Sequence, residues 1–130
     1  MRKEIITSEK LRRPHAIYSH AVKVKAGSFL FTKGTTARDR HGNLVGKGDI
    51  KAQTRQIFEN IKVILEEAGG TLDNIIKLTT FVTDISKFQE IHEVRAEYFK
   101  HDFPASTMVE VRRLAHDELL IEIEAVAALD

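Results

Sequence analysis

Alternating apolar and polar residues predict two strands in the C-terminal part of the chain. Residues 105–112 alternate, and so do residues 120–128, because successive side chains on a strand point to opposite faces of a sheet. The polar turn at 115–118 predicts that these strands form an antiparallel pair. One face of the second strand is entirely apolar and carries Ile121, Ile123, Ala125 and Ala127.

The other face of segment 120–128 carries charge within the most hydrophobic part of the chain. Glu122 and Glu124 lie between Leu120 and Val126. Either this face is solvated, as in many antiparallel sheets, or it belongs to a wet functional site or a subunit boundary. A carboxylate in apolar surroundings needs a partner, so the sequence keeps both interpretations open.

Two further strands and a shorter one are predicted in the N-terminal part. Residues 4–7 form the short strand, and residues 21–25 and 28–32 flank Ala26-Gly27, a pattern that predicts a compact hairpin. The polar segment 35–43 leaves the end of this hairpin. Loops of this kind often form the wall of a site.

Helical periodicity marks two segments. Asp49 is a good N-cap for a helix that runs to about Ala68 and that Gly69-Gly70 would end. A β-branched strand follows at 73–83, and a second helix is predicted at about 85–100.

The order of these elements predicts a single α+β domain over residues 1–130, with two helices packed on one face of a mixed sheet. If Val109 and Val111 pack on the helices together with Ile121 and Ile123, the opposite face carries Met108, Leu120 and Val126 among its charges. An uncovered apolar patch of that size predicts an oligomer.

The second helix places two basic side chains on an aromatic stripe. His92 and Arg95 recur at helical spacing with Phe88 and Phe99. Either they lie at the edge of the packed face with their tips in water, or they line a pocket or a subunit boundary.

Composition narrows the functional classes. The chain has 130 residues, a net charge of +1 with interspersed acids and bases, and no cysteine. The absence of cysteine excludes a disulfide scaffold and a thiol nucleophile. The charge pattern provides no basic stripe for nucleic acid. No run reaches membrane-spanning length, so we expect a cytoplasmic protein that does not bind membranes.

The sequence contains none of the motifs that mark common cofactor and metal sites. It lacks a glycine-rich phosphate loop, a nucleophile elbow and a zinc-protease signature, and its six histidines show no ligand spacing. We therefore expect no cofactor and no metal.

Several short motifs, taken together, resemble the RidA/YjgF family of reactive enamine and imine deaminases. They occur in order over nearly the whole chain: AIYSHAV at 16–22, FTKG at 31–34, QTRQIFENIK at 53–62, EYF at 97–99, PA at 104–105, VEV at 109–111 and IEIEA at 121–125. The resemblance implies a chorismate-mutase-like α+β fold, a homotrimer whose sheets line a central barrel, and ligand sites in clefts between subunits.

The resemblance also implies site residues. Tyr18 and Gly34 match the family's site tyrosine and glycine, and Glu122 matches the glutamate that orients water. At other positions the chain departs from the family: Lys33 replaces a serine, His92 stands where asparagine is common, Met108 replaces a frequent cysteine, and Ser106 replaces the substrate-binding arginine.

The loss of that arginine is the most serious departure. An arginine binds a carboxylate with two charge-assisted hydrogen bonds, whereas serine offers one neutral hydroxyl. Lys33, His92 or Arg95 could restore the positive charge, but the sequence does not place their tips.

Three functional hypotheses follow from the resemblance. The leading one is hydrolytic deamination of a small carboxylate-bearing enamine or imine at an intersubunit cleft. Tyr18 and Glu122 would handle the proton and the water, and Gly34, Ser106 and a nearby cation would bind the substrate. The alternatives are a non-catalytic trimer that binds a metabolite or a protein partner and, ranked last because of the near-neutral charge, an endoribonuclease or translation inhibitor.

Overall fold

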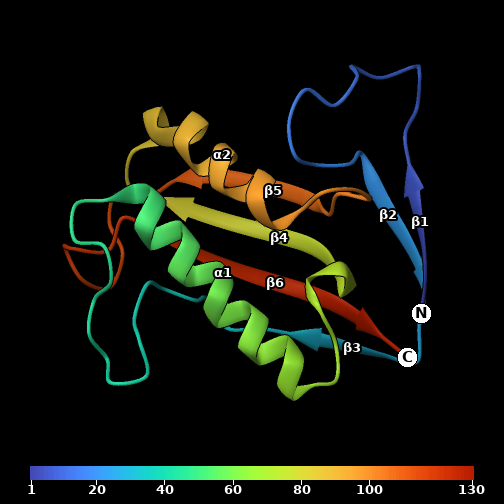
Figure 1. Cartoon of the computed structure of the whole chain (residues 1–130). Helices are drawn as coiled ribbons and strands as arrows, with labels where there is room; N and C mark the ends of the chain where they lie inside the picture. The colour runs from blue at the N-terminus through green and yellow to red at the C-terminus, as the bar shows by residue number, and fades with distance from the viewer.

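The computed structural model describes residues 1–130 and has two layers, a four-stranded sheet and two helices that cover one of its faces (Figure 1). The order of strands in the sheet is β3, β6, β4, β5, and only the β4–β5 pair is parallel. The elements of these layers are β3 (Ser28–Phe31), α1 (Ile50–Glu67), β4 (Ile75–Val82), α2 (Phe88–Tyr98), β5 (Ala105–Glu110) and β6 (Ile121–Leu129). The predicted α+β class, a mixed sheet with two helices on one face, is confirmed.

Helix α1 begins and ends at the residues that the sequence indicated. The Asp49 carboxylate accepts a hydrogen bond from the backbone N–H of Ala52 at 3.0 Å, which satisfies a donor of the first turn. Gly69 has a φ of +80°, and the N–H of Gly70 donates to the carbonyl of Leu65 at 2.8 Å. A left-handed residue after the last turn is the usual glycine-dependent helix stop.

Helix α2 is shorter than the 85–100 segment that was predicted. The short 3-10 helix η2 (Ile85–Lys87) comes first, and the Asp84 side chain caps it by accepting from the N–H of Ser86 at 3.0 Å. Another short 3-10 helix, η1 (Leu72–Asn74), precedes β4.

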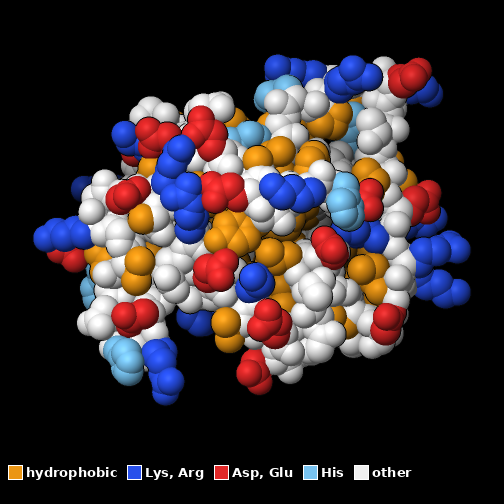
Figure 2. All heavy atoms as spheres, in the orientation of Figure 1, with side chains coloured by type: hydrophobic (Ala, Val, Ile, Leu, Met, Phe, Trp, Pro, Cys, Tyr) orange, Lys and Arg blue, Asp and Glu red, His pale blue; other side chains and the backbone are white.

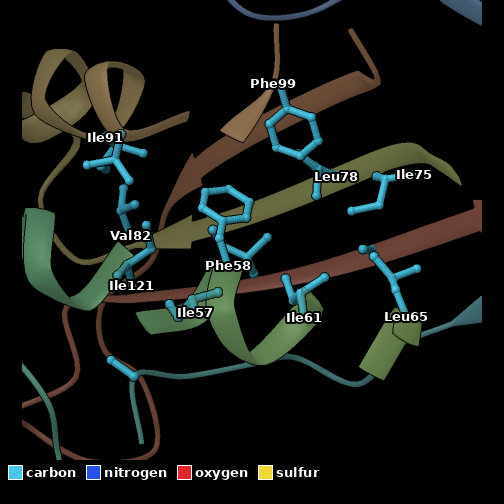
Figure 3. Packing of buried hydrophobic residues seen from close by; sticks show 14 of the residues in the cluster. Ile57, Phe58, Ile61, Leu65, Ile75, Leu78, Val82, Ile91, Phe99 and Ile121 are labelled. Carbon is cyan, nitrogen blue, oxygen red and sulfur yellow. The ribbon is translucent and has the colours of Figure 1, made fainter. Parts of the chain in front are cut away.

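The hydrophobic core lies between the two helices and the sheet (Figure 3). Large apolar side chains of this kind contribute about 1.5 to 3 kcal/mol each when fully buried, so the helices are fixed on the sheet. Those with no exposed surface include Ile57, Phe58, Ile61 and Leu65 of α1 and Ile75, Leu78, Val82, Ile121 and Ile123 of the sheet.

The prediction of a hairpin around Ala26-Gly27 is wrong. Strand β2 (Ala21–Lys25) pairs with β1 (Arg2–Ile6) in a separate two-stranded sheet, and β3 pairs with β6. The N–H of Gly27 donates to the carbonyl of Leu129 at 2.9 Å, and a Cβ on Gly27 would lie 2.8 Å from the backbone of Asp130. Pairing with the C-terminal strand therefore replaces the local turn.

The predicted antiparallel pairing of the two C-terminal strands is also wrong. Strands β5 and β6 do run in opposite directions, but β4 lies between them and pairs with both. The connection from β4 through α2 to β5 forms a parallel crossover, and a helix is the usual way to join parallel neighbours.

The structure reverses the two faces of β5 relative to the arrangement considered from the sequence. Ser106 and Met108 pair with Leu78 and Thr80 of β4, whose side chains are fully buried toward the helices. Val109 is 39% exposed on the opposite face. Ser106 and Met108 therefore belong to the helix side of the sheet.

The two sides of the molecule differ in character. On the helix side, acidic and basic side chains are interspersed over the surface (Figure 2). The face of the sheet that turns away from the helices, hereafter the outer face, has no covering element. Phe29 and Phe31 of β3 are 53% and 74% exposed there, and Phe31 pairs with Val126 of β6.

Candidate functional site

The first group of predicted site residues surrounds Glu122 on the outer face. Strand β6 places Glu122 opposite Phe81 of β4, and Thr35 exchanges two backbone hydrogen bonds with the neighbouring Ile123, at 2.8 and 3.0 Å. This pairing brings Gly34 against the Glu122 side chain, so that a Cβ on Gly34 would overlap the carboxylate. Only glycine leaves this approach free.

Glu122 is partly buried, and its carboxylate makes no hydrogen bond or ion pair with any other residue of the chain. Lys33 precedes Gly34 and lines a groove of about 400 Å³ with Arg38, Arg40 and Asn60 among its other residues. A free carboxylate beside an open backbone is suited to orient a water molecule or to accept a proton.

The second group gathers under α2, on the helix side of the sheet. The Nε2 atom of His92 accepts a hydrogen bond from the backbone N–H of Ile17 at 2.7 Å, and the Nη2 atom of Arg95 donates to the Ile17 carbonyl at 2.9 Å. The same Nη2 atom donates to the Ser106 hydroxyl at 2.8 Å. Two residues of one helix thus bind both backbone groups of Ile17.

Arg95 is a buried cation without a counter-ion. Its side chain is 2% exposed, no carboxylate contacts it, and its Nε–H has no hydrogen-bond partner. Burial lowers the pKa of Arg95 to about 10, and the group stays charged at neutral pH. Burying a charge without an opposite charge is costly, so this position calls for a functional reason.

His92 is neutral in this arrangement. Because its Nε2 atom accepts from Ile17, the proton of the neutral ring is on Nδ1, and Nδ1 has no partner. The pKa of His92 is lowered, first by burial and then by the charges of Arg95 and His15. The ring also stacks on Phe88 with the ring centroids 5.0 Å apart.

The hydrogen bond from Ile17 makes folding stability depend on the protonation of His92. A folded-state pKa below the ordinary 6.5 means that the unfolded chain binds the proton more readily. Stability is therefore fully present above 6.5 and falls as the pH drops below it. We expect His92→Gln, whose amide oxygen can accept from Ile17, to flatten this loss in urea unfolding measured on both sides of that pH. His116→Gln, in an exposed turn, is the matched control, and an equal pH slope in all three proteins would contradict this role.

Tyr18 and Met108 lie at the margins of the second group. The Tyr18 hydroxyl and the Nδ1 atom of His15 are 3.0 Å apart, and this pair sits near the surface beside Ile17. Met108 packs against the hydrophobic core and presents no polar group.

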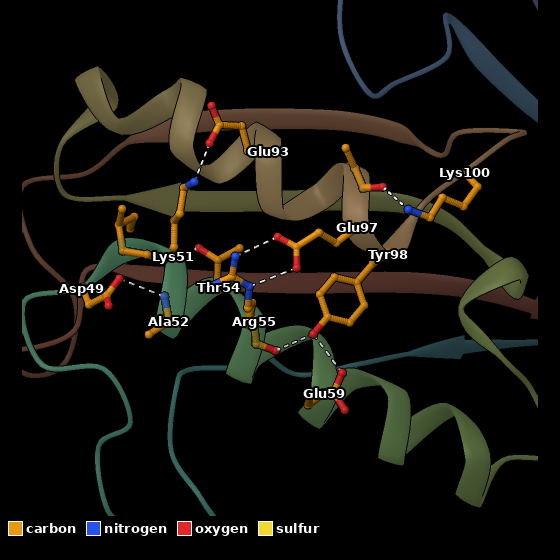
Figure 4. Close-up of polar contacts among 12 residues, drawn as sticks. Asp49, Lys51, Ala52, Thr54, Arg55, Glu59, Glu93, Glu97, Tyr98 and Lys100 are labelled. Atoms are coloured by element: carbon orange, nitrogen blue, oxygen red, sulfur yellow. Dashed lines mark hydrogen bonds and ion pairs between the residues drawn. The ribbon is translucent and has the colours of Figure 1, made fainter.

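Contacts between the two helices hold the second group in place (Figure 4). Arg55 of α1 binds the Glu97 carboxylate through two hydrogen bonds of 3.0 and 2.8 Å, and Tyr98 donates to Glu59 at 2.8 Å. Burial and Glu59 raise the pKa of Tyr98 to about 12, which keeps its hydroxyl protonated as a donor. These contacts fix α2, which carries His92 and Arg95.

A single chain does not bring the predicted site residues together. Gly34 and Glu122 meet on the outer face, whereas Tyr18, His92, Arg95, Ser106 and Met108 lie on the α2 side. Lys33, next to Gly34 in the chain, lines a groove together with residues of α1. Sequence reasoning missed the backbone of Ile17 and the buried, unpartnered hydroxyl of Thr80. Backbone groups leave no signal in side-chain patterns.

Another cavity contains none of the predicted site residues. This cavity of about 630 Å³ lies at the start of α1, between Asp49, Lys51, Asp84 and Lys87 among others. No group of three or more histidine, aspartate or glutamate side chains is arranged to hold a metal ion.

The fold and these two groups of residues define a class of protein, which comparisons with known proteins identify. The family model described as Endoribonuclease L-PSP matches residues 9–129. A RutC family protein of Pyrococcus abyssi is 46% identical over 127 residues, 98% of each chain, and one of Pyrococcus horikoshii is 49% identical over 125 residues, 96% of this chain and 97% of the relative.

Comparison with solved structures leads to the same family. A protein of unknown function of the conserved Rid family from Yersinia pestis superimposes with a TM-score of 0.89 at 34% identity, covering 99% of this chain and 100% of the other. RidA from a Psychrobacter species gives 0.74 at 32% identity, with coverages of 97% and 99%.

The chain therefore belongs to the RidA/YjgF/RutC family, as the sequence motifs indicated, and it has the chorismate-mutase-like fold of that family. None of its helices combines the length and the apolar composition needed to cross a membrane.

Proposed function

We propose that this protein hydrolyses a small enamine or imine that carries a carboxylate, releasing ammonia and a 2-oxoacid. Water adds to the imine carbon, a proton moves to the nitrogen, and the C–N bond breaks as the carbonyl forms. The observation that carries the proposal is the unpaired Glu122 carboxylate held against Gly34. Such a group can orient the water and take its proton.

The complete site is formed by two copies of the chain. Lys33, Gly34 and Glu122, hereafter the glutamate half, come from one subunit, and Tyr18, His92, Arg95, Ser106 and Met108, hereafter the arginine half, come from its neighbour. The separation of these groups within one chain and the uncovered apolar outer face support this arrangement. A homotrimer with intersubunit clefts, as the family resemblance implies, would bring the two halves together.

The first test measures ammonia release from freshly generated 2-iminoacids against the uncatalysed rate. We expect Glu122→Gln to lower turnover by roughly a hundredfold or more, because an amide cannot take up the proton. Glu124→Gln removes an equal charge two residues away on the same face, and the turnover of this variant should stay near that of wild type. Equal turnover of wild type and Glu122→Gln would refute the role given to Glu122.

Ser106 favours a second candidate, a non-catalytic protein that binds a metabolite or a protein partner. A serine hydroxyl lacks the charge of the arginine that the family motif places there. This candidate predicts thermal stabilisation by a small carboxylate without any product, and turnover of the bound molecule would count against it.

Endoribonuclease activity, which the description of the matching family names, ranks last. The net charge is +1, and phosphate backbones are usually bound by clustered basic residues. RNA cleavage by the purified protein that disappears in Glu122→Gln would reverse this ranking.

A further inference from the structure

The guanidinium of Arg95 occupies a position that no opposite charge balances. Its present acceptors are two neutral oxygens, the Ile17 carbonyl and the Ser106 hydroxyl, and its Nε–H has none. A guanidinium has five donors and binds carboxylates more strongly than neutral carbonyls. Its hydrogen-bonding capacity is therefore incompletely used in the free protein.

Ser106 is what makes this arrangement possible. It stands at the position where the family motif has an arginine, and its hydroxyl is 2.8 Å from Nη2 of Arg95. An arginine at 106 would bring a second guanidinium against the first, at a cost in repulsion. With serine at 106, β5 carries no guanidinium, and the serine hydroxyl accepts a hydrogen bond from the guanidinium of Arg95. The cation of this site therefore lies on α2 instead of β5.

The segment that covers Arg95 is attached in a way that permits its displacement. The backbone of Ile17 contacts α2 through two hydrogen bonds, one to His92 and one from Arg95, and its partly buried side chain packs at the edge of the hydrophobic core. Ser19, two residues later, is bound separately: its hydroxyl donates to the Phe103 carbonyl at 2.5 Å and its N–H to the Pro104 carbonyl at 3.2 Å. Ser19 can therefore act as a pivot while the two bonds of Ile17 open.

We propose that Arg95 binds the carboxylate of the substrate and that the carbonyl of Ile17 occupies the place of that carboxylate in the free protein. Residues 14–18 form the cover, which the ligand displaces. The Nδ1–H of His92, one helical turn before Arg95, is a second unpaired donor on the same side of α2. This inference rests on the proposed function, since it names the group that recognises the substrate of that site.

Binding of pyruvate, a stable 2-oxoacid, tests the proposal without turnover. We expect Arg95→Met to weaken binding measured by calorimetry by roughly 10- to 100-fold, the loss of one charge-assisted contact. Pyruvamide, which has no carboxylate, should bind wild type and Arg95→Met equally weakly. Arg2→Met, which removes an exposed arginine of β1 outside both halves of the site, should bind pyruvate like wild type.

Two further variants distinguish the loss of the Arg95 contact from a general loss of folding. Arg95→Lys keeps the charge and should bind more tightly than Arg95→Met if folding, checked by circular dichroism, is intact. The double variant Arg95→Ser with Ser106→Arg returns the cation to β5 and should regain binding. Pyruvate affinity that is unchanged in Arg95→Met, equal affinities of wild type for pyruvate and pyruvamide, or no binding at all would each overturn the proposal.

Hydrogen exchange tests the cover. Saturating pyruvate should speed exchange of the Ile17 amide by at least about tenfold, because its bond to His92 opens. Unchanged or slower exchange in the bound protein would contradict the displacement. Carboxylate-dependent binding of pyruvate by wild type without ammonia release from any 2-iminoacid would count against the proposed reaction and leave this inference standing. Ammonia release by wild type with unaltered pyruvate binding in Arg95→Met would count against this inference alone.

Discussion

Two inactive variants, one defective in each half of the site, should regain activity when they assemble with one another. Glu122→Gln damages the glutamate half, and Arg95→Met damages the arginine half. In a mixed ring some interfaces combine the intact glutamate half of one subunit with the intact arginine half of the next. A native site takes its glutamate half from an Arg95→Met subunit and its arginine half from a Glu122→Gln subunit. In an equal mixture that assembles at random, about a quarter of the interfaces meet both conditions.

The experiment requires heteromers of known composition. The two variants would be co-expressed with different affinity tags and purified over both, and ammonia release from 2-iminoacids would be compared with that of each homomer. A doubly tagged Glu122→Gln assembly is the matched control. Recovery well above both homomers supports a site shared between subunits, whereas the absence of recovery from two inactive homomers indicates that each chain carries its own site.

Local signals in the sequence located most elements of the fold. Asp49 and Gly69 mark the ends of α1 because a capping carboxylate and a left-handed glycine act within a few residues. The pairing of strands was not predictable in this way. The Ala26-Gly27 turn is compatible with a hairpin, but β3 pairs with β6, which lies about a hundred residues further along the chain and leaves no local signal near the turn.

The candidate site shows the same limit. The family motifs identified Gly34 and Glu122, and the structure brings these two residues together. Whether Ser106 faces the helices or the outer face depends on the register of β5 against β4, and a shift by one residue would reverse it. The position of the Arg95 tip depends on that register and on the backbone of Ile17, so the sequence could only name it among three cations.

Phe31→Asp should dissociate the assembly and abolish its activity. Phe31 is 74% exposed in the single chain, so the substitution removes little packing within the subunit. In an assembly that covers the outer face, the same side chain is buried, and burying a phenylalanine contributes about 1.5 to 3 kcal/mol. An aspartate there also loses hydration, so we expect subunit affinity to fall by at least roughly a hundredfold.

Sedimentation analysis would measure the mass of the variant, and circular dichroism would show whether the monomer keeps its fold. Val63→Asp is the matched control, because Val63 is 57% exposed but lies on α1, away from the outer face. We expect Val63→Asp to keep the mass of the wild-type assembly. A folded Phe31→Asp monomer without deaminase activity would mean that the outer face assembles the site, because neither half can act on the substrate alone. A folded monomer with full activity would mean that the glutamate and arginine halves work within one chain.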